Sequence, residues 1–131
     1  MINIGKIGED AATKHLIKKR WHILARNYRV RGGEIDIVAY RSGIIAFVEV
    51  KTRTGDAFGT PREAVDDEKI KRFWKARRDL TDHYLINGRI PVQYGFLKLN
   101  RKVFTLRNDI IEVYAFRNGD IKSINHIKDA F

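Results

Sequence analysis

Two runs of alternating apolar and polar residues, 33–38 and 47–52, most constrain how this chain can fold. A period of two is typical of a half-buried strand, and the turn residues 41–44 between the runs favour an antiparallel hairpin. A turn centred on Ser42 and Gly43 makes paired positions sum to 85, which places Asp36 opposite Glu49. Like charges directly opposite each other destabilise a sheet, so this pairing requires a compensating cation.

The same register places Glu34 opposite Lys51 on the face that carries the two carboxylates. A divalent cation between Asp36 and Glu49, with Lys51 beside it, would offset the repulsion, so the pattern indicates a metal-dependent active site. A solvated, charged sheet face is the alternative, because Glu-x-Lys is common on strands. The opposite, apolar face is predicted to consist of Ile35, Ile37, Val48 and Val50.

Length and composition favour a single globular domain, residues 1–131. The chain has no apolar run that could cross a bilayer, no signal-peptide stretch and no cysteine for disulfides or a thiolate zinc site, so we expect a cytoplasmic protein. Its 26 Lys and Arg residues exceed its 16 Asp and Glu residues, giving a net charge of +10. Such a charge is typical of a polyanion binder, although it does not separate nucleic acid from a membrane or ribosome-like partner.

Residues 7–21 have the apolar period of a helix. Glu9 lies on the inward stripe with Ala12 and Leu16, so we interpret it as a site residue. Asp10 is interpreted as complementing the helix dipole in the first turn. Carboxylates inside a basic field are what a phosphodiesterase requires, because the acids bind metal and the cations bind phosphate.

The remaining elements follow from periodicity and turn signals. Residues 22–30 are predicted as a strand, and 60–86 as a helix whose capping signals lie at 60–63. The basic side of that helix is interpreted as a solvated face unless it adjoins the acidic cluster; it comprises Lys69, Lys71, Arg72, Lys75 and Arg78.

Further strands are predicted at 91–99, 103–106, 110–116 and 121–131, with turns at 100–101 and 108–109. The order α-β-β-β-α-β with extra C-terminal strands predicts an α+β fold, in which a mixed sheet is flanked by helices.

Five phrases in this order resemble the PD-(D/E)XK nuclease core, which has the restriction-endonuclease-like fold. They more closely resemble the YraN-like family of small, endonuclease-like bacterial proteins. The resemblance covers residues 5–99, and its Glu, Asp, Glu-x-Lys spacing is also similar to that of archaeal Holliday junction resolvases, which are dimeric and metal-dependent. The phrases lie at residues 5–12, 26–29, 33–39, 47–53 and 58–65.

One stretch departs from the family pattern. Members of the YraN-like family usually carry Arg-Phe-Asp on the strand after the long helix, where this chain has Gln93, Tyr94 and Gly95. Gly95 has no carboxylate, so it cannot take over any role that this aspartate has in the family.

The resemblance implies a role for each candidate residue. Asp36 and Glu49, with the carbonyl of Val50, would hold Mg²⁺ or Mn²⁺. Lys51 would orient the attacking water or stabilise developing negative charge, and Glu9 would be an outer ligand. The residues implied to contact backbone phosphates are Arg26, Arg29 and Arg53.

We therefore expect a metal-dependent endonuclease acting on DNA, including branched or structured DNA. A homodimer suits a small enzyme that must cut two strands. The alternatives are a non-catalytic nucleic-acid-binding protein on a nuclease scaffold and a basic accessory protein of the ribosome or membrane surface. The four histidines have no close ligand spacing, and no serine elbow or nucleotide-binding glycine loop occurs.

Overall fold

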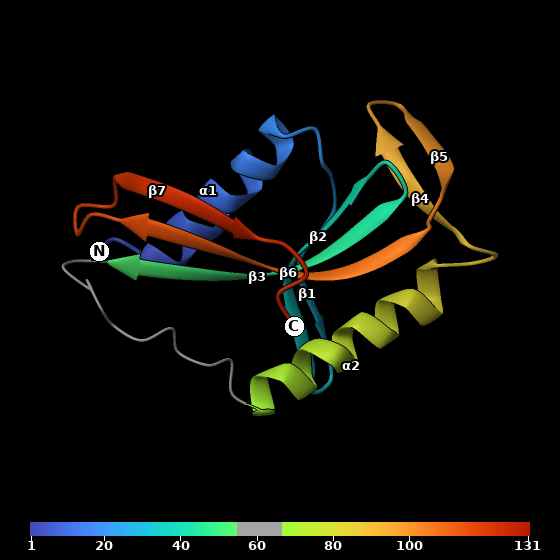
Figure 1. Ribbon diagram of the computed structural model, residues 1–131, viewed down its shortest axis with the longest axis horizontal. Helices are drawn as coiled ribbons and strands as arrows, with labels where there is room; N and C mark the ends of the chain where they lie inside the picture. The colour runs from blue at the N-terminus through green and yellow to red at the C-terminus, as the bar shows by residue number, and fades with distance from the viewer. Residues whose placement is uncertain (55–66) are drawn as a thin grey trace.

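The computed structural model describes residues 1–54 and 67–131. In these residues the chain forms a mixed α+β fold, in which helices α1 (Ile4–Lys18) and α2 (Asp67–Tyr84) lie on opposite sides of a sheet (Figure 1). The predicted fold class and element order are confirmed. The strands are β1 (His22–Val30), β2 (Gly33–Arg41), β3 (Ile44–Thr54), β4 (Arg89–Tyr94), β5 (Leu97–Lys102), β6 (Thr105–Ala115) and β7 (Ile121–Ile127).

The main sheet has five strands in the order β1-β2-β3-β6-β7. Its pairs are antiparallel except for β3 and β6, which run parallel from the pair Ile44–Thr105 to the pair Thr54–Ala115. Parallel neighbours need a long crossover connection. Here the connection includes α2 and a separate two-stranded sheet formed by β4 and β5.

Apolar residues fill the space on both sides of this sheet. On the α1 side, Leu16 and Trp21 pack with Ile37 and Val48. On the α2 side, the core includes Phe47 of β3 and Phe73 and Leu80 of α2. Strands covered on both faces read as near-continuous apolar runs, and β3 is buried from Ile45 to Glu49.

Two glycines allow the helices to approach the strands that carry the candidate site. A Cβ on Gly33 would lie 2.7 Å from the Arg72 carbonyl oxygen of α2, and a Cβ on Gly8 of α1 would lie 1.8 Å from Thr52 Oγ1 of β3. Both positions therefore require glycine if the helices are to keep these distances.

The first helix begins and ends earlier than predicted. Asn3 is its N-cap, and the Asn3 side chain accepts a hydrogen bond from Lys6 N at 3.0 Å. At the other end, Arg20 has a φ of 70°, and the chain then enters β1. The capping asparagine and the left-handed residue set the two ends of α1. The apolar period predicted both ends three residues too late.

Several predictions for the C-terminal strands are wrong. The strand predicted at 91–99 is a hairpin, because Gly95 has a φ of +58° and forms a two-residue turn with Phe96 between the paired Tyr94 and Leu97. The turn predicted at 100–101 lies within β5, and the turn predicted at 108–109 lies within β6, so the strands predicted at 103–106 and 110–116 are one strand.

Asn108 and Asp109 remain in β6 because polar partners compensate for their burial. Asn108 accepts a hydrogen bond from Arg77, and Asp109 accepts hydrogen bonds from Arg107, His126 and the backbone N–H of Asp129. Burial raises the pKa of Asp109, but the hydrogen bonds from His126 and Arg107 outweigh burial and hold that pKa below its ordinary value.

The helix start predicted at 60–63 and the family phrase at 58–65 lie outside the described residues. Among the residues that the structure does describe, neither helix has the length and apolar character needed to cross a membrane.

We expect Gly33→Ala to destabilise the protein by about 1–3 kcal/mol, because its methyl group would push against the backbone of α2. Gly5→Ala is the matched control, since the nearest atom to a Cβ at Gly5 is 3.6 Å away. Urea unfolding followed by circular dichroism measures both variants. Equal midpoints for Gly33→Ala and the parent protein would contradict the close packing of α2 on β2.

Candidate active site

The β2–β3 hairpin opens at the end far from its turn. Its pairs follow the predicted register, including Ile37 with Val48, and the ladder ends there. The pairs predicted beyond it, Asp36 with Glu49 and Glu34 with Lys51, are not part of the ladder. Instead, the backbone N–H of Val50 donates to Asp36 Oδ2 at 2.8 Å. We call this point, formed by Asp36, Glu49 and Val50, the strand fork.

The separation of β2 from β3 also changes which face Ile35 occupies. Ile37, Val48 and Val50 pack on the α1 side as predicted, whereas Ile35 is fully buried on the α2 side. The prediction that all four share one face is therefore wrong for Ile35. Strict alternation fails here because β2 leaves the β2–β3 ladder at Asp36.

Two other predicted acidic residues, Glu49 and Glu9, act on Asp36 at the fork. Burial, followed by the negative charge of Glu49, raises the pKa of Asp36 to about 7, and the charge of Glu9 adds to this effect. Glu49 is only 6% exposed. We call Glu9, Asp36 and Glu49 the carboxylate site. The structure thus brings together residues from α1, β2 and β3.

A lysine from α2 lies against this site. Lys69 Nζ is 2.7 Å from Glu49 Oε1, and this hydrogen bond raises the pKa of Lys69. From the sequence, Lys69 is predicted to lie on a solvated helix face unless that face adjoins the acidic cluster. The structure meets this condition, because Lys69 contacts Glu49. Helical periodicity shows which side of a helix is polar, but it does not show what that side faces.

Lys51 lies further along β3, beside Glu112 of β6 in the parallel ladder. Within the described part of the chain, Lys51 forms no ion pair. Arg53 Nε is 3.5 Å from Glu112 Oε2, and the Arg53 side chain is 16% exposed. Glu112 was not predicted as a site residue, because its only signal in the sequence is an acid within an apolar run. Arg53 forms its ion pair with this acid.

Arg26 and Arg29 lie on the other side of the fork, near Glu9. A cleft of about 520 Å³ is lined by both arginines together with Glu9 and Asp10. Arg26 Nη2 is 2.8 Å from Asp10 Oδ1, and Arg29 Nε is 3.6 Å from Glu34 Oε2. Because α1 begins at Ile4, Asp10 lies beyond its first turn, so it acts as an ion-pair partner and the dipole interpretation is wrong.

The oxygen donors at the fork suit a hard divalent cation. Asp36 uses Oδ2 to accept from Val50 N, and Glu49 uses Oε1 for Lys69, so each carboxylate has a second oxygen for a metal. A cation here would also offset the repulsion that raises the pKa of Asp36. Within residues 1–54 and 67–131, no group of three or more acidic or histidine side chains forms a preformed metal cluster.

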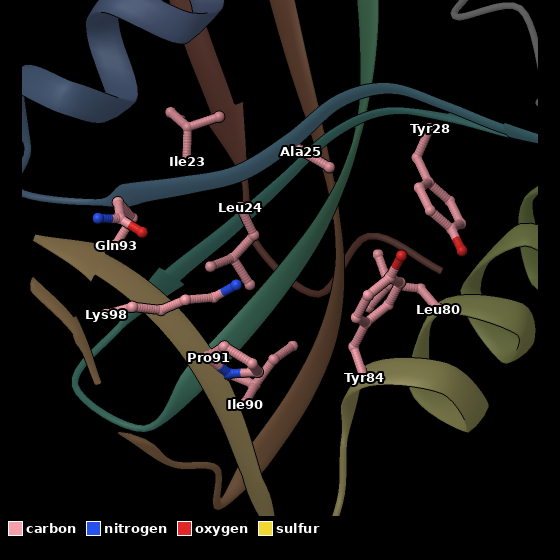
Figure 2. A pocket seen from close by; sticks show the side chains of 10 residues that line it. All are labelled: Ile23, Leu24, Ala25, Tyr28, Leu80, Tyr84, Ile90, Pro91, Gln93 and Lys98. Carbon is pink, nitrogen blue, oxygen red and sulfur yellow. The ribbon is translucent and has the colours of Figure 1, made fainter. Parts of the chain in front are cut away.

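A second hollow lies away from the carboxylate site, between β1, α2 and the β4–β5 hairpin. It has a volume of about 370 Å³ and no acidic residue among the described residues that line it. Figure 2 shows Lys98 of β5 reaching across this groove towards Leu24, with Tyr28 and Tyr84 at the other end. Burial and a hydrogen bond to Asp79 raise the pKa of Tyr28, so its hydroxyl stays protonated.

The chain is similar to a family of known proteins. The model of the uncharacterised protein family UPF0102 matches residues 8–113. The chain belongs to family UPF0102. This is the YraN-like family that the sequence phrases resemble, so that prediction is confirmed.

Relatives in UPF0102 match nearly the whole chain. A UPF0102 protein of Alkaliphilus oremlandii is 41% identical over 128 residues, covering 98% of this chain and 97% of the relative. One of Alkaliphilus metalliredigens is 36% identical with the same coverage, and one of Flavobacterium johnsoniae is 35% identical, covering 98% of this chain and 93% of the relative. The strand fork and the carboxylate site all lie within the region that the family model matches.

We expect Asp36→Asn to stabilise the metal-free protein at pH 8, by on the order of 1–3 kcal/mol. The pKa of Asp36 is raised to about 7, above its unfolded value, so ionisation opposes folding. This penalty grows between about pH 4 and pH 7, and the stabilisation should therefore shrink at pH 5. Asparagine keeps an oxygen for the Val50 N–H.

Urea unfolding of both proteins at the two pH values measures this effect, with Asp120→Asn on the exposed β6–β7 turn as the control. Equal stabilisation at pH 5 and pH 8 would contradict the raised pKa. Added Mn²⁺ should raise the melting temperature of the parent protein and not that of Asp36→Asn.

Proposed function

We propose that this UPF0102 protein is a metal-dependent endonuclease that hydrolyses phosphodiester bonds of DNA, including branched or structured DNA. The observation that carries the proposal is the meeting of Asp36 and Glu49 at the strand fork, where burial and mutual repulsion raise the pKa of Asp36. Perturbed acids in a partly buried position are typical of functional sites. The net charge of +10 supports a polyanionic substrate.

Asp36 and Glu49, with the Val50 carbonyl, would hold Mg²⁺ or Mn²⁺. When bound, such an ion polarises a phosphoryl oxygen and lowers the pKa of a coordinated water. Glu9, on the α1 side of the fork, would orient water through its carboxylate. Lys69 would release Glu49 when the ion binds, because both cations compete for the same carboxylate.

The basic residues around the fork support a path for the phosphate backbone. Arg26 and Arg29 border the cleft beside Glu9, and their partners Asp10 and Glu34 are themselves half-exposed, so phosphates can compete for both guanidinium groups. Arg53 is bound to a buried Glu112, and its role as a phosphate contact stays a prediction. We further propose that the enzyme acts in the cytoplasm, as a homodimer where both strands of a duplex are cut.

The first test is cleavage of labelled single-stranded, duplex, flap and four-way-junction DNA, with Mg²⁺ or Mn²⁺ and with EDTA. We expect metal-dependent cutting that Glu49→Gln reduces by about 100-fold or more, because the metal supplies several kcal/mol of transition-state stabilisation. Lys14→Ala on the exposed side of α1 is the surface control and should cut like the parent protein, whereas a contaminating nuclease would cut equally in all three preparations. Tight, salt-sensitive binding with no cutting in any metal would instead favour the non-catalytic binding protein.

A second test separates the two lysines. We expect Lys51→Ala to lower the cleavage rate by roughly 100-fold, because it removes charge that stabilises the transition state. Lys69→Ala should instead lower the Mg²⁺ concentration needed for half-maximal rate, since Glu49 no longer has a competing cation. Metal titrations of both variants measure this difference. A rate loss in Lys69→Ala that equals the loss in Lys51→Ala would assign the catalytic charge to Lys69.

A further inference from the structure

The two-stranded sheet formed by residues 89–102 projects from the end of the molecule near the β2–β3 turn (Figure 1). We call this sheet the hairpin arm. Every residue of β5 is exposed, whereas Ile90 and Val92 of β4 are buried in the α2-side core. Tyr40 Oη donates to the Lys102 carbonyl at 2.9 Å. The arm therefore has a defined position on the protein and presents β5 to solvent.

Positive charge is concentrated on this arm. Residues 83–108 contain no aspartate or glutamate. At the base of the arm lies a hollow of about 330 Å³, and the described residues that line it include three cations and no carboxylate. Its polar lining residues are Tyr40, Ser42, Arg89, Asn100, Arg101 and Lys102. Guanidinium, ammonium, amide and hydroxyl groups together are complementary to a phosphate.

The tip of the arm carries a fully exposed aromatic side chain. Gly95 and Phe96 form the two-residue turn, and the relative exposure of Phe96 is 104%. Leu97 and Leu99 beside it are 62% and 43% exposed. An aromatic ring held at an exposed turn is a platform on which a nucleic-acid base can stack, whatever the base sequence.

We infer that the hairpin arm is a second nucleic-acid contact, in which an unpaired base stacks on Phe96 and backbone phosphates bind the basic hollow. This inference rests on the proposed function in taking nucleic acid as the ligand, and it narrows the substrate class to nucleic acids with an unpaired segment. Paired bases already stack on one another, so a blunt duplex offers Phe96 no free base.

Charge favours this ligand over a second copy of the chain. Antiparallel pairing of two β5 strands over their full length would place Lys98 of each copy opposite Arg101 of the other. Like charges across a strand pair are destabilising. A phosphate backbone instead neutralises these cations and releases its own counterions.

The test measures fluorescence anisotropy of a labelled 20-nucleotide oligo(dT) and of a blunt 20-base-pair duplex, both in EDTA so that no cutting occurs. We expect Phe96→Ala to weaken oligo(dT) binding roughly 5- to 100-fold, the range for one base–aromatic stack, and to leave duplex binding nearly unchanged. Phe116→Ala is the matched control, because Phe116 is 51% exposed at the β6–β7 turn, far from the arm in Figure 1.

The basic hollow is tested by salt dependence. Arg101→Ala should make the slope of log K against log salt for oligo(dT) shallower by about 0.7, the contribution of one phosphate contact. Arg117→Ala, on the exposed β6–β7 turn, is the charge-matched control and should leave the slope unchanged. Equal slopes for Arg101→Ala and Arg117→Ala would overturn the assignment of the hollow.

Oligo(dT) binding by Phe96→Ala that equals binding by the parent protein would overturn the inference. The inference is also overturned if Phe96→Ala weakens only binding to phosphatidylglycerol vesicles, which would indicate a membrane contact. A change only in the mass measured by light scattering would indicate a contact between copies of the chain and would overturn it as well. The two proposals fail separately. Weakened binding without metal-dependent cutting by the parent protein removes the proposed function alone, whereas cutting with no effect of Phe96→Ala removes the inference alone.

Discussion

The whole structure depends on β3, which pairs on both edges and is covered on both faces. It is antiparallel to β2 from Ile44 to Val48 and parallel to β6 along its full length of 11 residues. A strand in this position requires a helix on each side, and α1 and α2 supply the two layers. Glu49 lies where the apolar centre of β3 gives way to polar residues. Its carboxylate is therefore largely removed from water, while its backbone stays paired with β6.

The strand fork follows from that position. A half-buried carboxylate beside a buried one is unfavourable, and the raised pKa of Asp36 reflects this free-energy cost. The Val50 N–H and the Lys69 ammonium offset part of that cost in the metal-free protein. Natural proteins commonly accept such local instability where it serves binding or catalysis. The same carboxylates are structurally costly without a cation and good ligands for one.

The carboxylate site and the hairpin arm lie at different places in the molecule. The carboxylate site lies where β2 and β3 part, whereas the hairpin arm lies beyond the turn that joins them (Figure 1). The arm is a sheet of its own, and its contact with the body runs through Tyr40 and the buried residues of β4. Substitutions at distant sites without shared partners have additive effects, so binding by the arm and chemistry at the fork can be measured independently.

The β2–β3 hairpin, its register up to Val48 and the fold class can be predicted from the sequence alone, because strand period and turn chemistry are local properties. The same patterns select Glu9, Asp36 and Glu49 as candidate site residues. Local patterns mispredict residues whose backbone conformation depends on distant partners. Asn108 and Asp109 have turn propensity but lie in a strand, since Arg77, Arg107 and His126 satisfy their buried polar groups. The contacts of Lys69 with Glu49 and of Arg53 with Glu112 are visible only in the folded protein. These ion pairs join separate elements, and their formation depends on how helices and strands pack, which no local pattern encodes.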